Sequence, residues 1–274
     1  MILTATIGNR ILSFALFEKG QDPCSIQPIT TVQLAAQPPR TADEYAALLG
    51  EMLMKKANAV AIDGAILASV VPPLTDEIRR ALRLLYPQLP CLTVGAGLRS
   101  GLTIRTDAPA ELGADLVATA AGALALCKPP FLVLDCGAVT TLSAVGKGKN
   151  APEFLGCAIL PGPPLCVDAL KIHAAQLPHV ALSTPHCAIG TNTGDSVRAG
   201  LLLGQAAAVE GLAARGAQER GEDALPLIAT GEGVELFLST SSLAVRHDAH
   251  LAHRGLYRLA MLNEQKSGSF RKRG

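Results

Sequence analysis

The stretch that decides the fold is Phe131-Leu-Val-Leu-Asp-Cys-Gly-Ala-Val-Thr-Thr-Leu-Ser-Ala-Val145. Its first four residues are apolar and predict a buried strand, while residues 141–145 alternate polar and apolar, as a returning antiparallel strand does. Several phosphotransferases hold nucleotide and cation with a carboxylate at a strand end beside a glycine turn, as Asp135 and Gly137 would be here. A hairpin whose Asp and Thr side chains cap their own turn gives the same pattern, so both interpretations stay open for this stretch alone.

The composition excludes some classes of function. The chain has 274 residues, of which 49% are hydrophobic, enough for one large domain or two of about 130 residues each. Aromatic residues make up only 3% and the net charge is +1, which disfavours a nucleic-acid partner. Seven cysteines without close pairs predict reduced thiols. The chain shows no signal-peptide layout at its start and no apolar run of about 18 residues, so we expect a cytoplasmic protein without a membrane partner.

Hydrophobic patterning predicts the same order of elements twice. In the first half we expect a hairpin over residues 1–17, a strand over 25–34, a helix from Thr41 to about Met54, a strand over 60–71, a helix over 75–85 and a strand over 91–94. In the second half we expect three strands over residues 131–161, helices over 165–176 and 193–218, a strand over 225–230 and a helix from Val234. Two halves that each open on a strand, a glycine turn and a strand suggest an internal duplication.

Short motifs along almost the whole chain carry a family resemblance. They are Ile7-Gly8-Asn9, Ser69-Val-Val-Pro-Pro73, Gly113-Ala-Asp115, Asp135-Cys-Gly137 with Thr140-Thr141, Gly156-Cys-Ala-Ile-Leu-Pro-Gly162, Asn192-Thr193 with Gly200, Thr230-Gly231 and Leu251 with Gly255-Leu256. In this order they resemble the motifs of type III pantothenate kinases. The resemblance implies an α/β fold of two ribonuclease-H-like domains of the actin and acetate-kinase type, with mixed five-stranded sheets flanked by helices. We place the domains at residues 1–112 and 113–262, followed by a basic, disordered tail over 263–274.

The resemblance also implies a reaction and its site. ATP with Mg²⁺ would phosphorylate pantothenate to 4'-phosphopantothenate, the first step of coenzyme A biosynthesis, and Asp115 would be the general base. Asp135 would hold a monovalent cation, K⁺ or NH₄⁺. The phosphates would lie against Gly8, Asn9, Arg10, Gly137 and Thr140, and pantothenate against Gly113, Ala114 and Thr193. The resemblance further implies a homodimer.

The sequence departs from the family pattern where that pattern is charged. Thr6 stands where the family has a carboxylate, and Arg10 stands where it has a threonine beside the phosphates. Leu116 replaces the arginine of the G-A-D-R motif, and Ala138 replaces the threonine of D-x-G-T. Each lost electrostatic contact at such a site costs several kcal/mol of transition-state stabilisation. Three readings follow: a divergent active kinase, a kinase for a different small acceptor, or a pseudokinase that binds a ligand or joins a genuine kinase in a heteromer.

One histidine cluster lies outside these motifs. His247, His250 and His253 recur at three-residue spacing and could share one face of a helix. Such a row is more often solvated than metal-binding, and no Cys or carboxylate cluster completes a site. We therefore expect a solvent-exposed histidine stripe.

Overall fold

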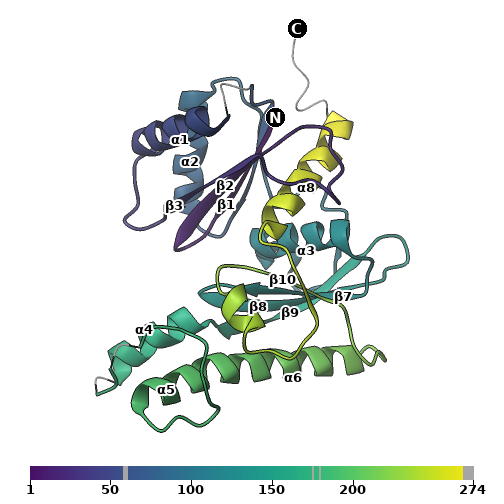
Figure 1. Cartoon of the computed structure of the whole chain (residues 1–274). Helices are drawn as coiled ribbons and strands as arrows, with labels where there is room; N and C mark the ends of the chain where they lie inside the picture. The colour runs from purple at the N-terminus through teal and green to yellow at the C-terminus, as the bar shows by residue number, and fades with distance from the viewer. Residues whose placement is uncertain (58–60, 175, 179, 268–274) are drawn as a thin grey trace. The chain divides into compact units, whose positions relative to one another are not determined.

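The chain folds into two compact units (Figure 1). The computed structural model describes residues 1–57, 61–174, 176–178 and 180–267. The first unit comprises residues 1–126, 150–152 and 250 onwards, and the second comprises residues 127–149 and 153–249. These ranges differ from the domain boundaries expected from the sequence, because the helix that follows residue 113 and the C-terminal helix both belong to the first unit.

The first unit is built on a mixed five-stranded sheet of order β3-β2-β1-β4-β5. Its elements are β1 (Ile2–Ile7), β2 (Ile11–Phe17), β3 (Thr30–Ala35), α1 (Ala42–Ala57), β4 (Gly64–Ser69), α2 (Pro72–Leu85), β5 (Cys91–Thr93), β6 (Thr103–Ile104), a 3₁₀ turn (Pro109–Glu111), α3 (Ala114–Leu126) and α8 (Leu251–Ser267). β1 pairs antiparallel with β2 and parallel with β4. The hairpin, the helices and most strands lie where the sequence predicts them, with ends shifted by a few residues.

Alternation along β1 places side chains on both faces of this sheet. Leu3, Ala5 and Ile7 pack on one face with residues of α1 and α2. Ile2 packs on the opposite face, with Leu256 of α8 and other residues of α3 and α8. Figure 1 shows α1 and α2 on one side of the β1–β3 strands and α8 on the other. The sheet is therefore covered on both faces, which is the layered arrangement of an α/β domain.

The helices α3 and α8 approach each other so closely that glycine is required at two positions. A Cβ added at Gly255 would lie 1.8 Å from the Ala118 carbonyl oxygen, and one at Gly122 would lie 2.1 Å from the Leu251 carbonyl oxygen. Each glycine thus allows the backbone of one helix to touch the backbone of the other. α8 continues to Ser267, past the start of the expected tail at residue 263, and residues 268–274 of that tail lie outside the described residues.

The second unit repeats the topology of the first. Its elements are β7 (Phe131–Cys136), β8 (Val139–Gly146), β9 (Glu153–Pro161), α4 (Pro163–His173), α5 (Thr193–Arg198), a π-helical turn (Ala199–Leu203), α6 (Gly204–Gln218), β10 (Leu227–Thr230), α7 (Val234–Leu238) and β11 (Val245–His247). Within the unit the strands run β11-β10-β7-β8-β9. β7 pairs antiparallel with β8 and parallel with β10, as β1 does with β2 and β4. The duplication suggested by the sequence pattern is thus visible in strand order and direction.

One helix, spanning residues 193–218, is long and apolar enough to cross a membrane by length and composition. It is nevertheless part of the packing of the second unit, because Ala206 and Val209 are buried in its core. Glu210 on the same helix accepts hydrogen bonds from the Ser241 and Ser242 hydroxyls and from the Ser242 amide. The helix is therefore a partly buried core helix.

Candidate active site

The N-terminal motif forms the tight turn between β1 and β2. The Gly8 amide donates to the Ile11 carbonyl at 3.0 Å, which closes the turn. A Cβ at Gly8 would lie 3.1 Å from that same oxygen, so a larger residue would press on the closing bond. Asn9 and Arg10 are exposed at the tip. The turn therefore presents one amide and one guanidinium to solvent, with Thr6 just before it on β1.

The second glycine motif forms the corresponding turn between β7 and β8. Asp135 is the last residue but one of β7, as Thr6 is of β1, and each lies two residues before the turn glycine, Gly137 or Gly8. The two units thus offer one equivalent position each for a carboxylate. Only the second unit carries one there.

The Asp135 carboxylate lies beside the glycine that follows β10. Asp135 lies opposite Thr230 of β10 in the strand register. The next residue, Gly231, has a φ of +98°, and a Cβ there would lie 2.5 Å from Oδ1 of Asp135 and 2.6 Å from the Cys136 carbonyl oxygen. Gly231 therefore leaves the space that the carboxylate occupies. Burial, and secondarily the Asp135 charge, raises the pKa of the Cys136 thiol to about 12, so this neighbour is a neutral thiol.

The β7–β8 turn is also packed against the start of α4. The Gly162 amide donates to the Ala138 carbonyl at 2.7 Å. A Cβ at Gly162 would lie 2.0 Å from the Gly137 carbonyl oxygen. The glycine of the 156–162 motif thus lets the chain pass directly beside the turn that carries Gly137. This contact explains why that motif needs its final glycine.

Thr140 lies on β8 and is buried, with 1% of its surface exposed. Its hydroxyl accepts a hydrogen bond of 2.8 Å from the Gln205 side-chain amide of α6. Gln205 also lies 3.5 Å from the Pro161 carbonyl oxygen, to which it donates. The sequence analysis missed Gln205, because a single glutamine in a helix gives no local signal of a partner 65 residues away. A phosphate contact by Thr140 stays a prediction.

The Gly-Ala-Asp motif opens α3. Asp115 lies in the first turn of the helix, and its Oδ1 accepts the Leu116 amide at 2.9 Å. A Cβ at Gly113 would lie 2.4 Å from the same Oδ1, so glycine at this position leaves room for the carboxylate. A negative charge in the first turn is favoured by the helix dipole. Leu116 is buried, so the residue that replaces the motif arginine has become part of the packing.

Thr193 begins α5 in the second unit. Asn192 caps this helix, because its side-chain oxygen accepts the Asp195 amide at 2.9 Å. The exposed Thr193 hydroxyl has no hydrogen-bond partner among the described residues. Asn192 thus caps the helix, and the Thr193 side chain faces solvent.

The histidines do not form the expected stripe, and that prediction is wrong. His247 ends β11, His250 precedes α8, and His253 is buried within α8 with 5% of its surface exposed. The Thr4 hydroxyl donates to the Ala15 carbonyl, so it accepts from Nδ1–H of His253 at 2.8 Å. Nε2 of His253 then accepts from the Ser13 hydroxyl at 2.9 Å. Burial lowers the pKa of His253 to about 3, and His250 contributes to the shift.

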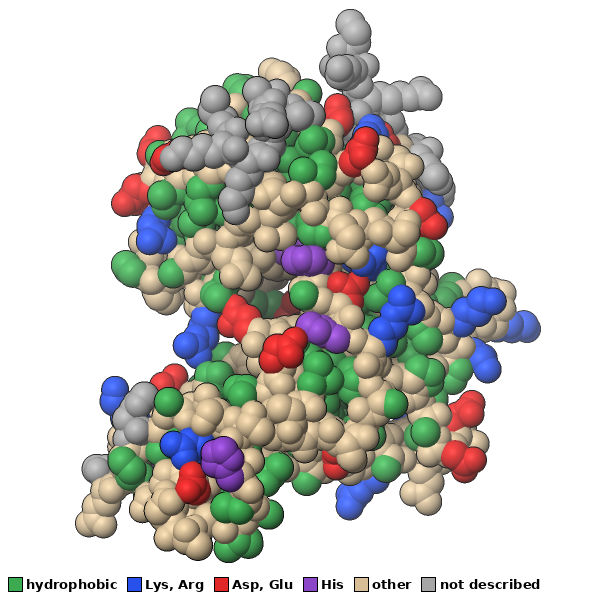
Figure 2. Space-filling model, in the orientation of Figure 1, with side chains coloured by type: hydrophobic (Ala, Val, Ile, Leu, Met, Phe, Trp, Pro, Cys, Tyr) green, Lys and Arg blue, Asp and Glu red, His purple; other side chains and the backbone are tan. Residues whose placement is uncertain are grey.

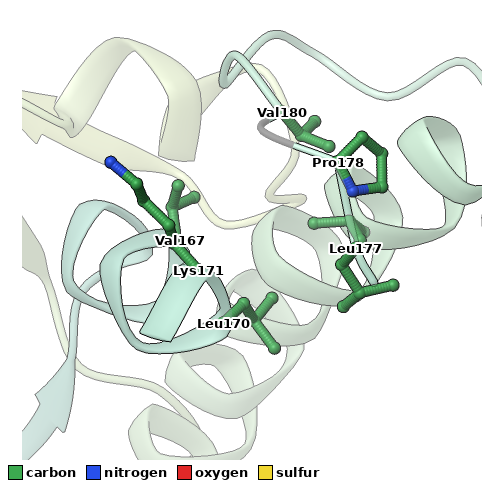
Figure 3. A pocket seen from close by; sticks show the side chains of 7 residues that line it. Val167, Leu170, Lys171, Leu177, Pro178 and Val180 are labelled. Atoms are coloured by element: carbon green, nitrogen blue, oxygen red, sulfur yellow. The ribbon is translucent and has the colours of Figure 1, made fainter. Parts of the chain in front are cut away.

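The metal-ligating and charged side chains outside these motifs are dispersed over the described residues. In the part of the chain that the structure describes, no group of three or more His, Cys, Asp or Glu side chains could hold a metal ion. A hollow between α4 and the segment that carries Leu177, Pro178 and Val180 is lined by Leu170 and Leu177 (Figure 3), but its volume of about 20 Å³ has room for little more than one water. Figure 2 shows basic and acidic side chains interspersed on the visible face.

These features define the class of protein. Two mixed sheets of the same topology, each opening on a glycine-turn hairpin, make the fold of the actin and acetate-kinase type. Solved structures agree on the fold: a Baf family protein from Campylobacter jejuni aligns with a TM-score of 0.59 at 17% identity, covering 96% of this chain and 99% of that one. The ADPNP-bound activator of 2-hydroxyisocaproyl-CoA dehydratase from Clostridium difficile aligns with a TM-score of 0.54 at 9% identity, covering 97% and 96%.

Within this class, the sequence identifies the family. The model of the type III pantothenate kinase family matches residues 2–215. A type III pantothenate kinase from Streptomyces avermitilis is 34% identical over 263 residues, covering 93% of this chain and 96% of its own. One from Phenylobacterium zucineum is 36% identical over 268 residues, covering 97% of this chain and 100% of its own. The chain belongs to the type III pantothenate kinase family, as the motifs predict.

Proposed function

We propose that this protein is an ATP-dependent kinase that converts pantothenate to 4'-phosphopantothenate, the first step of coenzyme A biosynthesis. One observation carries the proposal: both carboxylates of the family motifs are present, Asp115 in the first turn of α3 and Asp135 near the end of β7, two residues before the turn glycine Gly137.

Asp115 would act as the general base. The primary hydroxyl of pantothenate attacks the γ-phosphorus of ATP, its proton passes to the Asp115 carboxylate, and ADP leaves with the electrons of the broken P–O bond. Phosphoryl transfer depends mostly on positioning and charge stabilisation, so a base held at a fixed place suits it. Gly113 and Ala114 beside the base, and the solvent-facing Thr193 hydroxyl, would contact the acceptor.

The two hairpin turns would contact the nucleotide phosphates. Gly8, Asn9, Gly137 and Thr140 take this role by family resemblance. Arg10 supports it through its own chemistry, because an exposed guanidinium at the tip of a glycine turn is suited to bind phosphate oxygens. It would supply positive charge that the family's threonine does not.

The residues present suit a monovalent cation at Asp135 better than they suit Mg²⁺ at Thr6. The half-buried Asp135 carboxylate beside the Gly231 turn suits a monovalent cation, K⁺ or NH₄⁺, which would balance charge near the phosphates. The position equivalent to Asp135 in the first unit holds the neutral Thr6 hydroxyl, a poor ligand for Mg²⁺. Mg²⁺ would therefore arrive with ATP and be held mainly by the phosphates. We place the protein in the cytoplasm, where ATP and pantothenate occur together.

A homodimer is part of the proposal, supported by the outer face of the 193–218 helix. Gly200, Gly204, Ala207, Ala208 and Gly211 on this face are exposed. A Cβ at any of the three glycines would meet nothing within 4 Å. Glycine inside a helix costs about 1 kcal/mol relative to alanine. No contact among the described residues offsets that cost, whereas close packing of a second copy would.

Two departures from the family pattern favour a second candidate function. Thr6 stands in place of a carboxylate, and Leu116 stands in place of an arginine. A pseudokinase would keep the fold and bind pantothenate, or join a genuine kinase in a heteromer, without transferring phosphate. A kinase for a different small acceptor is a variant of the same idea, because the buried Leu116 cannot pair with a carboxylate.

Product formation by the purified protein separates these candidates. We expect ATP-dependent formation of 4'-phosphopantothenate in the presence of K⁺, at a low rate because of Thr6 and Leu116. Failure to form product, together with pantothenate binding in calorimetry, would exclude the kinase and leave the pseudokinase. Phosphorylation of another hydroxyl compound at a higher rate would indicate the changed acceptor.

A further inference from the structure

Gln205 is a polar residue on the inward face of the 193–218 helix. Leu202 lies one turn before it and Val209 one turn after it, and both are buried. Ala206, the next residue, packs with Val209 in the core of the second unit. A glutamine among buried apolar side chains needs hydrogen-bond partners for its amide, because an unpaired polar group is costly there. The partners of Gln205 therefore indicate its role.

The Gln205 amide joins two neighbouring strands beside the β7–β8 turn. Its nitrogen, Nε2, lies 2.8 Å from the Thr140 hydroxyl oxygen of β8 and 3.5 Å from the Pro161 carbonyl oxygen at the end of β9. A carbonyl oxygen only accepts hydrogen bonds, so the amide end that meets both oxygens is its NH₂ group. The Thr140 oxygen must therefore accept a hydrogen bond from Gln205 and cannot donate one to it.

This arrangement leaves the hydrogen of the Thr140 hydroxyl unused. A threonine hydroxyl can both donate and accept, and only its accepting side is engaged here. Among the described residues, no acceptor is bonded to this hydrogen, although the side chain is buried. A buried donor without an acceptor is costly. We therefore expect the hydrogen to meet an acceptor that a ligand brings.

The position of Thr140 fits a ligand at the β7–β8 turn. Thr140 lies opposite Cys136 in the strand register, and Cys136 directly precedes the turn glycine, Gly137. The Cys136 carbonyl already accepts the Gly233 amide at 2.7 Å. The free hydroxyl hydrogen thus lies at the end of the hairpin that the proposed function places against the nucleotide phosphates.

We propose that Gln205 is a positioning residue for nucleotide binding: it holds the Thr140 oxygen as an acceptor, so that the Thr140 hydrogen is kept for a phosphate oxygen. This inference rests on the proposed function, in which Thr140 contacts the phosphates. Gln205 acts through Thr140 and not on the phosphate directly. The bond between them is buried, so water competes little with it. A hydroxyl that is already held in place loses little freedom when the nucleotide binds.

A double-mutant cycle separates this role from a merely structural one. Gln205→Met keeps the length of the side chain and removes the amide. Gln205→Asn keeps an amide on a chain that is one methylene shorter, and so pulls it away from Thr140. Thr140→Val removes the hydroxyl, and it is also combined with Gln205→Met. Gln218→Met makes the control change at an exposed glutamine at the end of the same helix.

Calorimetric titration of each full-length protein with MgADP, in the presence of K⁺ and without pantothenate, measures the affinity, and circular dichroism checks the fold. We expect Gln205→Met and Gln205→Asn to bind ADP about three- to tenfold more weakly than the wild type, as the loss of one neutral hydrogen bond implies. Gln218→Met should bind it equally. Thr140→Val should lose about tenfold or more, because a hydrogen bond to a charged phosphate is stronger. In the Thr140→Val background, Gln205→Met should change the affinity by less than about twofold.

Three results would overturn the proposal. They are an absence of ADP binding to the wild type, wild-type affinity in a folded Gln205 variant, and an equal loss from Gln205→Met with and without the Thr140 hydroxyl. The last result would mean that Gln205 supports the site only through its bond to Pro161. The cycle is measured without turnover. A wild type that gives the expected ADP pattern but forms no 4'-phosphopantothenate would therefore uphold this inference and refute the proposed kinase.

Discussion

The close crossing of α3 and α8 predicts that Gly255→Ala destabilises the protein, although alanine has the higher helix propensity. Gly255→Ala adds a Cβ 1.8 Å from the Ala118 carbonyl oxygen and 2.7 Å from the Gly122 amide nitrogen. Ordinary contact begins at 3.4 Å, so the first distance is about 1.6 Å too short. Both neighbours are backbone atoms and cannot rotate away. The helices must therefore separate, which loosens the packing of buried Ala118 against α8.

The expected cost follows from two opposing terms. Overpacking costs about 1–3 kcal/mol, or more when backbone must move, and helix propensity returns about 1 kcal/mol for Gly→Ala. Because backbone atoms must move, we expect the upper end of that range, a net loss of about 2 kcal/mol in the free energy of unfolding, with a fall in Tm of roughly 2–4 °C for each kcal/mol. Gly216→Ala on α6 is the matched control, because its Cβ would meet only a flexible Arg220 nitrogen at 3.7 Å.

Urea-induced unfolding followed by circular dichroism measures both variants. Gly216→Ala should stabilise the protein by about 0.5–1 kcal/mol, since it removes the entropy cost of glycine without a clash. If Gly255→Ala were as stable as the wild type, or more stable, the close approach of α3 and α8 described here would be wrong.

Three further predictions concern pH, assembly and catalysis. The pKa of His253 in the folded protein, about 3, lies below its ordinary 6.5. The contribution of neutral His253 to the free energy of unfolding is therefore fully present above pH 6.5, and it is lost as the pH falls towards 3 because the unfolded state takes up a proton. The loss should be about 2 kcal/mol at pH 5, and His253→Gln should flatten this part of a pH series of urea titrations. Ala208→Glu places a charge on the proposed dimer face and should halve the mass measured by light scattering, whereas an unchanged dimer would argue against that face. Thr6→Asp combined with Leu116→Arg should raise kcat/KM for pantothenate at least tenfold, and an unchanged value would mean that these losses do not limit turnover.

Much of the fold could be predicted because its signals are local. The hairpin around Gly137 follows from an apolar run, a glycine and an alternating strand, all within 15 residues. The assignment of α3 and α8 to one unit could not be predicted, because it depends on Gly122 and Gly255 meeting across 133 residues of chain. A single glycine in a helix looks the same in sequence whether it faces a neighbouring backbone or solvent.

The candidate site residues could likewise be predicted only where a local motif marks them. Asp115 and Asp135 were recognisable by their motifs, but the hydrogen bond from Gln205 to Thr140 joins residues that carry no motif in common. His253 was misassigned because its three-residue spacing from His250 imitates a helix face, although α8 begins only at Leu251. Burial and long-range partners decide the role of such side chains, and neither is written in local spacing.

The most direct test of the central claim is product formation by three proteins. Purified wild type, Asp115→Asn and Asp223→Asn are incubated with ATP, Mg²⁺, K⁺ and pantothenate, and 4'-phosphopantothenate is measured by mass spectrometry. Asp223 is an exposed residue of the loop before β10, so its amide variant controls for the loss of a charge. We predict product from the wild type and Asp223→Asn, and a fall of about 10²–10⁴-fold in Asp115→Asn. Product from Asp115→Asn at the wild-type rate, or no product from the wild type, would contradict the account.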